Sequence, residues 1–584
     1  FALLMGGPGN QASSSKGKDK DSDFEGRSIG HVQDDVDDED AEGQPLLNNK
    51  KSNGAYLFEG EDYEHPAALN LWGLVPFLVK LQNSFGSKLL MMLFVSQHLL
   101  KGFINEFTAP AIQYIYKNYQ VAGPQMQIYK GVTHLPWAMK PVIGLLSDVL
   151  PIFGFNKSPY ILIVAVMGTA ATAAIGLTPQ PLLSVSSLVI CLFGCQLQFA
   201  TTDLLTEAKY AEKMQSRPQE GPALMTYVWA GMQIGGLVAT LLVGPTIEHA
   251  GPKMPFLLAV IPCSLIIVPI LKGYMDEERL TEEQVKEARA RILGQREACV
   301  LCLLMLAGTL ILVIVGIRYQ NVKMNALVSI AVAIVILLAF SAVLRPEIAK
   351  VTAWSLVQTS VSFSVGGGAF YFYTDTPEQY PEGPHFSTVF FTTVLGTMGS
   401  ICSLIGIWSY QRYASDWTYR RLYLVSNVAI SVLSITDVVF FKRLNVKWGI
   451  PDHAFVVGSS VFQGILMQWQ WMPGVVMLSQ LCPKGMEATM YALLAGCHNL
   501  GSNIAASCGA WLLQALSCNP SGAKNESEEF KYLWVGSAVG AVLPALTLFA
   551  LPWFVPDKKQ TDKLIKDGES SATKGSLWRR WKGL

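Results

Sequence analysis

Charged residues are scarce in this chain. Asp, Glu, Lys and Arg together make up 15% of its 584 residues, whereas soluble proteins usually contain about 25%. The formal net charge is zero, so no excess of either sign suggests nucleic acid as a partner. Hydrophobic residues make up 51%, and the mean hydropathy is +0.32. This composition indicates an integral, multi-pass membrane protein whose constant partner is the lipid bilayer.

The sequence also lacks the motifs of the common enzyme classes. We find no Walker loop, no HExxH zinc motif and no GxSxG with triad partners. The glycine run at 366–368 lies inside an apolar segment, where close helix packing explains it better than phosphate binding. These absences predict a protein that is not an enzyme, holds no cofactor or metal and does not draw on ATP.

Ten cysteines are present, and most stand in apolar runs. Cys299 and Cys302 have CxxC spacing, but Val and Leu surround them and no second ligand pair lies nearby. We therefore interpret them as apolar helix residues rather than zinc ligands. Cys508 and Cys518 leave one alternative open, a disulfide outside the membrane.

Apolar segments that could cross a bilayer follow one another from residue 88 onward. A spanning helix needs roughly 20 mostly apolar residues, and fourteen such segments are predicted in three groups. They are 88–116, 126–150, 159–178, 181–206, 221–245 and 254–271, then 299–317 and 324–344, then 350–374, 386–411, 420–441, 454–480, 486–514 and 532–555. The middle pair has almost no polar residue in its interior. Because only lipid-facing helices can be wholly apolar, we interpret this pair as an inserted hairpin.

An internal repeat supports this division. Residues 223–244 align without a gap to residues 488–509, so that Gly231, Gly236 and Gly244 match Gly496, Gly501 and Gly509. Such weak similarity between halves is typical of transporters built from two six-helix bundles. The predicted fold class is an all-α polytopic membrane protein with two six-helix halves, pseudo-two-fold symmetry and a two-helix insertion. It has about 14 transmembrane helices, or 12 if the hairpin does not cross.

The predicted division of the chain follows from these segments and from its charges. We expect a disordered cytosolic N-tail, a six-helix bundle, a charged linker helix, the inserted hairpin, a second bundle and a basic cytosolic C-tail. Their ranges are 1–70, 71–271, 272–298, 299–344, 345–556 and 557–584. Lys and Arg in 208–217, 272–298 and 411–421 place both termini in the cytosol, although 442–447 argues against this locally. The sequon at Asn525 then lies outside, where it can be glycosylated.

Charged side chains inside the apolar segments are the strongest functional candidates. A charge in hydrocarbon costs about 2.5–3.5 kcal/mol on insertion scales, so it is usually paired or faces a cavity. "WAMKPVIGLLSD" (137–148) carries Lys140, and "INEFTAPA" carries Glu106, which we predict to be its partner. The alternative is a permanent salt bridge that only packs the helices. Asp203 in "TTDLLTEAKYAE" is predicted to hold a proton or to grip an N–H pair of a heterocycle.

Aromatic and amide groups complete the predicted substrate site. Trp229 and Gln233 lie one turn apart, and Trp471 and His498 belong to later segments. Tryptophan faces stack on planar rings and amides read ring edges, although an interfacial aromatic belt is the alternative for these tryptophans. We predict a gate at the cytosolic side, and its candidate residues are Asp148, Lys157 and Glu487.

Three stretches together resemble one family. "WAMKPVIGLLSDVLPIFGFNKSPYI" (137–161), "DLLTEAKYAE" (203–212) and "LCPKGMEATMYALLAGCHNLG" (481–501) are similar to motifs of the folate–biopterin transporters, a branch of the major facilitator superfamily. The resemblance covers roughly 88–555. The chain departs from the superfamily in the loop after the second helix, where Lys157 stands in place of a cluster of basic residues.

The resemblance implies secondary transport of folates or pterins by alternating access, linked to protons, with a small-molecule substrate and a monomeric carrier. A folate has a planar pterin and an anionic glutamate tail, which Lys140 or another cation would neutralise. Members also carry other metabolites such as S-adenosylmethionine, and a non-transporting membrane sensor is a further alternative. The plasma membrane or an endosomal, vacuolar or plastid membrane is the expected location.

Overall fold

We describe the chain from a computed structural model, in which residues 73–217, 219–293, 296–482, 487–562, 564–565 and 571–582 are placed well enough to discuss. The predicted tail 1–70 lies outside the described residues. Residues 79–584 form one compact unit, and the fold below is that of this unit. Within the described ranges it is all helical, since the extended pairings there are two isolated bridges, Ile152 with Phe155 and Thr418 with Lys559.

Every one of the fourteen predicted segments is helical in the structure, and several of them are broken into pieces. The first half contains α2 (Ser87–Leu93), η3 (Phe94–Ile104), α3 (Asn105–Asn118), α4 (Gly123–Ala138), α5 (Lys140–Val149), α6 (Ser158–Leu177), α7 (Val185–Ser216), α8 (Gly221–Ala250), α9 (Met254–Ser264) and α10 (Ile267–Leu271). The linker helix α11 (Glu282–Leu293) and the hairpin helices α12 (Arg296–Arg318) and α13 (Val322–Val343) follow.

The second half repeats this pattern. It contains α14 (Pro346–Ser360), α15 (Gly366–Thr374), η5 (Val389–Val394), α16 (Leu395–Tyr413), α17 (Tyr419–Phe441), α18 (Leu444–Lys447), α19 (Asp452–Gln480), α20 (Glu487–Ala515), α21 (Leu533–Leu546), α22 (Leu551–Phe554) and the short α23 (Leu577–Trp581). Among the described residues, nine helices are long and apolar enough to cross a membrane, and α12 and α13 are two of them. The prediction of a multi-pass, all-α protein is confirmed, while the total of 14 crossings stays a prediction.

Proline explains the break that positions Lys140. Pro136 lies in the last turn of α4 and Pro141 in the first turn of α5, and neither has a backbone N–H to continue the helical ladder. The chain therefore bends at Met139, and Lys140 begins the new helix.

The two halves pack against each other in a pseudo-symmetric way. Helix α8 contacts η3 in its own half and η5 in the other, while α20 contacts α14 in its own half and α4 in the other. The repeated glycines permit these approaches. A Cβ atom on Gly244 would lie 3.0 Å from the Cα of Val389 in η5, and one on Gly509 would lie 2.9 Å from Nε2 of Gln127 in α4. The repeat seen in the sequence thus marks corresponding helix contacts.

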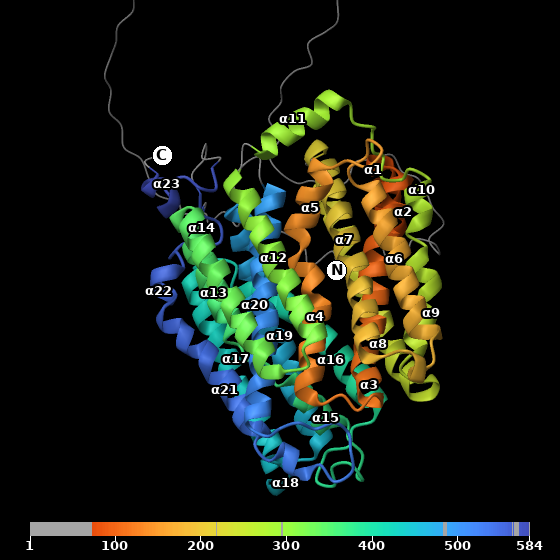
Figure 1. Cartoon of the computed structure of the whole chain (residues 1–584), viewed down its shortest axis with the longest axis vertical. Helices are drawn as coiled ribbons and strands as arrows, with labels where there is room; N and C mark the ends of the chain where they lie inside the picture. Colours follow the sequence, from red (N-terminus) through yellow and green to blue (C-terminus); the bar gives the residue numbers. More distant parts are fainter. Residues whose placement is uncertain are drawn as a thin grey trace, which may run out of the picture. The chain divides into compact units, whose positions relative to one another are not determined.

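The hairpin contacts both halves. Helix α12 packs on α4 and α5, and α13 packs on α14 and α20 (Figure 1). Its other faces expose large apolar side chains, such as Leu303, Ile314 and Leu338, which is what lipid contact requires. The C-terminal segment contacts the start of this hairpin. Arg579 donates two hydrogen bonds, of 3.0 and 2.9 Å, to one carboxylate oxygen of Glu297.

Two ends of the bundle are needed to describe the site. The linker end carries α11 and the loop between α5 and α6, where Arg289 donates a 2.9 Å hydrogen bond to the carbonyl of Val149. The α15 end carries the loops 375–388 and 517–532. In Figure 1 α11 lies at the top of the view, and α15 and α18 lie at the bottom.

Candidate functional site

Asp203 holds two lysines at once. Its Oδ1 atom lies 2.8 Å from Nζ of Lys101, and its Oδ2 atom lies 2.6 Å from Nζ of Lys140. The aspartate side chain is 2% exposed. The three residues come from η3, α5 and α7, so this one carboxylate joins three long helices of the first half. The sequence prediction that Lys140 pairs with Glu106 is wrong, because Asp203 takes both cations.

Trp137 connects this ionic cluster with a chain of polar groups. Nζ of Lys140 lies 4.7 Å from the centre of the Trp137 ring, within the range of a cation–π contact. The indole N–H donates a 2.7 Å hydrogen bond to Gln196, and Gln196 donates one of 3.2 Å to Asn105. Asn105 in turn donates to Glu106 over 3.1 Å. Glu106 has no ion-pair partner among the described residues.

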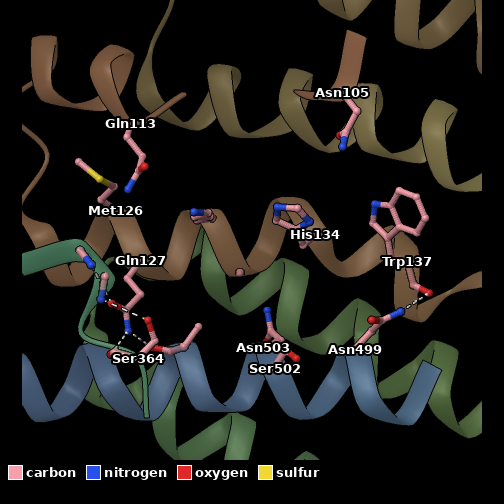
Figure 2. A pocket seen from close by; sticks show the side chains of 15 residues that line it. Asn105, Gln113, Met126, Gln127, His134, Trp137, Ser364, Asn499, Ser502 and Asn503 are labelled. Atoms are coloured by element: carbon pink, nitrogen blue, oxygen red, sulfur yellow. Dashed lines mark hydrogen bonds between the residues drawn. The ribbon is translucent and has the colours of Figure 1, made fainter. Parts of the chain in front are cut away.

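A cavity of about 420 Å³ lies between α3, α4 and α20, a size typical of small-molecule sites. Figure 2 shows Asn105 and Gln113 pointing toward α4 from one side, while Asn503 points toward it from α20. His134 and Trp137 stand on α4 between them. The lining of the cavity is rich in amides and hydroxyls, which can form hydrogen bonds with the polar edge of a planar ring.

Lys130 also lines this cavity, and sequence reasoning missed it. It stands one turn before His134 on α4. The signal was present in "YKGVTHLPWAMK", where Lys130, His134 and Trp137 recur at helical spacing and so share a face.

The other predicted binding residues are not among the described residues that line the cavity. Trp229 is 44% exposed, and its ring centre lies 5.8 Å from Nζ of Lys101. Gln233 is exposed one turn further along α8. In the second half the Trp471 and His498 rings meet at 5.4 Å, and Nδ1 of His498 lies 3.3 Å from the Thr359 hydroxyl.

The predicted gate residues lie at the linker end. Asp148 is exposed near the end of α5. Lys157 contributes its backbone rather than its ammonium group, since its N–H donates a 2.8 Å hydrogen bond to Glu277. Backbone N–H groups of Asn156 and Ser158 bond the same carboxylate at 2.8 and 3.0 Å, so Glu277 of the linker caps the start of α6. The side chain of Glu487 lies outside the described residues.

At the α15 end the two halves are joined. Nζ of Lys117 lies 2.7 Å from Oδ1 of Asp375, whose side chain is fully buried. The Tyr371 hydroxyl donates a 2.6 Å hydrogen bond to the carbonyl of Val121. Gln127 donates to the carbonyls of Ser364 and Ala506 at 2.8 and 2.6 Å. This end is therefore closed over the cavity.

The remaining predictions concern the loops. Asn525 is exposed at the α15 end, where its N–H donates a 3.1 Å hydrogen bond to the carbonyl of Glu378. All ten cysteines lie in the described ranges and none of them forms a disulfide, so Cys508 and Cys518 are not joined. Within the described residues, no group of three or more His, Cys, Asp or Glu side chains could hold a metal ion.

These features define a class of protein, an all-helical multi-pass membrane protein with a fold of the major-facilitator type. The fold matches the crystal structure of the peptide transporter POT in complex with sulfate, with a TM-score of 0.57 and 14% identity over 82% of this chain and 99% of that one. The inward-open xylose transporter XylE from E. coli matches with a TM-score of 0.50 and 11% identity, over 81% and 97% of the two chains.

The chain belongs to the BT1 family, whose model matches residues 101–575. It is 24% identical to the probable folate-biopterin transporter 6 of Arabidopsis thaliana, over 80% of this chain and 82% of that protein. It is 24% identical to the folate-biopterin transporter of Synechocystis sp., over 74% and 76% of the two chains. The resemblance predicted from the three motifs is confirmed. The family is one of membrane transporters of small molecules, not of enzymes.

Removal of the shared carboxylate tests the ionic cluster. Asp203→Asn leaves Lys101 and Lys140 without their counter-charge, and loss of one partner from a buried ion pair costs about 3–5 kcal/mol. We expect a marked fall in the thermal unfolding temperature of the detergent-purified protein, partly restored by adding Lys140→Met. Asp416→Asn, at an exposed position, is the control and should unfold like the parent. Equal stability of the Asp203 and Asp416 variants would contradict a shared counter-ion.

The buried carboxylate at the α15 end makes closure there depend on pH. Burial raises the pKa of Asp375 to about 6. The nearby charges have smaller effects on this pKa, because Lys117 and His385 lower it and Glu526 raises it. Lys117 also lies 5.7 Å from the Tyr371 ring. An aspartate in water has a pKa of about 3.9. The closed form therefore binds the proton more tightly than a form in which this side chain meets water, and acidification favours closure.

The measurement is a distance across the α15 end. Leu182 and Lys524 are highly exposed there, one in each half, and can carry spin labels after replacement by cysteine. The closed distance should gain population as the pH falls from about 7 to about 5. Asp375→Asn, which mimics the protonated form, should remove most of this dependence. Opening of the end on acidification would contradict the assigned sign.

Proposed function

We propose that the protein carries folates or pterins across a membrane by alternating access, driven by a proton gradient. The observation that carries the proposal is the amide-lined cavity between the halves, closed at the α15 end and beside an ionic cluster. It occurs in a chain whose named relatives are folate-biopterin transporters. A planar heterocycle of pterin size fits the amides and the aromatic face of Trp137.

We assign the other predicted binding residues to the same solute. In the proposal, Trp229 and Gln233 approach the solute from α8, and Trp471 and His498 approach it from the second half. Lys140 and Asp203 keep the first half rigid while the solute binds. Asp148, Lys157 and Glu487 belong to the opposite gate, at the linker end, where Glu277 already fixes the loop between α5 and α6.

Glu106 is the proposed proton-binding residue. It lies at the end of the hydrogen-bonded chain from Trp137 through Gln196 and Asn105, and no cation pairs with it among the described residues. Asp203 is less suited to this role because two lysines hold it ionised. A carboxyl without a counter-ion can gain and lose a proton without breaking an ion pair. In the proposal, the hydrogen bonds from Glu106 to Trp137 couple the protonation of Glu106 to the cavity.

The orientation, the membrane and the oligomeric state belong to the same proposal. Lys and Arg at the linker end favour a cytosolic position for that end and for both termini. The α15 end then faces the outside or an organelle lumen, where Asn525 is available for glycosylation. We propose that the carrier works as a monomer in the plasma membrane or in an endosomal, vacuolar or plastid membrane.

Two alternatives remain. The same scaffold would carry another organic metabolite, such as S-adenosylmethionine, if the cavity reads a different heterocycle. A membrane sensor would bind its ligand without moving it. Competition among folate, biopterin and S-adenosylmethionine distinguishes a folate or pterin carrier from a carrier of another metabolite. The presence or absence of saturable uptake distinguishes a carrier from a sensor.

The direct test is uptake of labelled folate and biopterin into proteoliposomes of the purified protein, with and without an imposed proton gradient. The proposal predicts saturable accumulation that follows the gradient and collapses with an uncoupler. Binding without uptake would support a sensor. Saturable uptake of S-adenosylmethionine alone would support the other carrier.

The Glu106→Gln variant separates coupling from binding. Glutamine keeps the shape and the hydrogen bond to Asn105 but cannot release a proton. We expect this variant to lose accumulation driven by the proton gradient and to keep exchange of labelled for unlabelled solute, which needs no net proton movement. Uphill accumulation at the wild-type level would contradict the role of Glu106. Asp416→Asn serves as the matched carboxyl-to-amide control.

A further inference from the structure

Lys130 differs from the other lysines that face the interior of the bundle. Lys101 and Lys140 share Asp203, and Lys117 is paired with Asp375. The ammonium group of Lys130 has no hydrogen-bond or ion-pair partner among the described residues. Its side chain is nevertheless solvent-accessible, inside the cavity between the halves.

The described lining of the cavity offers Lys130 no negative charge. Of the fifteen described residues that line the cavity, none is Asp or Glu. His134, one turn further along α4, is also accessible and also has no hydrogen-bond partner among the described residues. The cavity thus presents one fixed cation and one imidazole, within a lining that is otherwise amide, hydroxyl and apolar.

An ammonium group inside a membrane bundle costs free energy when no counter-charge is near it, and a bound anion would offset that cost. Because the described lining supplies no counter-charge, the anion has to come from outside the protein, and the solute that fills this cavity is a direct source of it. A carboxylate accepts hydrogen bonds from both an ammonium and an imidazole N–H, and such charge-assisted bonds are the stronger kind.

We propose that Lys130, supported by His134, is the counter-ion of a carboxylate on the transported solute and determines its specificity. The inference rests on the proposed function and narrows it. Carboxylated pterins of the folate type are preferred over neutral pterins such as biopterin. Lys140, the cation that the sequence favoured for this role, is occupied by Asp203 and positions its helix instead.

The cavity has two regions, which would contact different parts of the solute. Asn105 and Trp137 lie on the side of the cavity toward the ionic cluster, while Gln113 and Gln127 lie toward the α15 end (Figure 2). Along α4, Lys130 lies between Gln127 and Trp137. A Cβ atom on Gly131 would lie 2.8 Å from Nδ2 of Asn503, so the glycine keeps room for that amide opposite the helix.

The test compares two probes in two assays. Binding of p-aminobenzoylglutamate, which is anionic, and of biopterin, which is neutral, is measured by tryptophan fluorescence in purified protein. Uptake of folate and biopterin is measured in proteoliposomes. The variants are Lys130→Met and Lys130→Arg. Lys323→Met, at an exposed position of α13, is the matched control.

We expect Lys130→Met to weaken binding of p-aminobenzoylglutamate by about tenfold or more, as loss of a charge-assisted hydrogen bond does. Folate uptake should show the same rise in half-saturation, while biopterin binding and uptake stay at the level of the control. Lys130→Arg keeps the charge and should restore most of the preference.

The failures are distinguishable. If the wild-type protein transports neither folate nor biopterin, the proposed function fails. The inference is then judged on p-aminobenzoylglutamate binding alone. If Lys130→Met binds this probe as the wild type does, if the wild type does not bind it, or if the variant loses both probes equally, the inference is overturned.

Discussion

The structure depends on one carboxylate placed between two ammonium groups. Asp203 is almost fully buried and lies within 2.8 Å of both Lys101 and Lys140. Three charged groups in the middle of a membrane bundle are tolerable only when they neutralise one another and remain in contact. The first, second and fourth long helices of the first half are therefore fixed relative to each other. Such a connection suits the alternating access that we propose, in which this half would move as one body.

The same constraint explains the division of labour around the cavity. Lys101, Lys140 and Asp203 are used in joining helices, whereas Lys130 and Glu106 are the groups we propose for the solute and the proton. The second half contributes mainly amides and hydroxyls on α20, such as Asn503 and Ser502. The charged lining residue of the first half and the uncharged lining of the second half meet along α4 and α20, and the glycines of α20 allow that contact to be close.

Much of this could be predicted from the sequence, because hydropathy and small-residue patterns report directly on membrane helices. The helical segments could be predicted in this way, and the family from the three motifs. Charges inside apolar segments made Lys140 and Asp203 candidates. The pairing of these two could not be predicted, since nothing in the spacing says which carboxylate of several lies opposite a lysine on another helix. Lys130 was missed for a related reason, because only the fold shows that it faces a cavity without a counter-charge.

The backbone role of Lys157 shows the same limit. A basic residue after the second helix suggests a charge contact, but the structure uses its N–H group to bind Glu277, a residue 120 positions away. Contacts of this kind depend on where the linker folds back.

The most direct measurement is the reactivity of a cysteine placed at Ser502, an exposed position of the cavity wall. A membrane-impermeant thiol reagent is applied to sealed vesicles of each orientation, at neutral pH and with or without folate, and labelling is compared with that of the parent chain. The account predicts labelling from the linker side in the form closed at the α15 end, and protection by folate. Labelling mainly from the α15 side, or labelling that folate leaves unchanged, would show that this cavity is not the solute pathway.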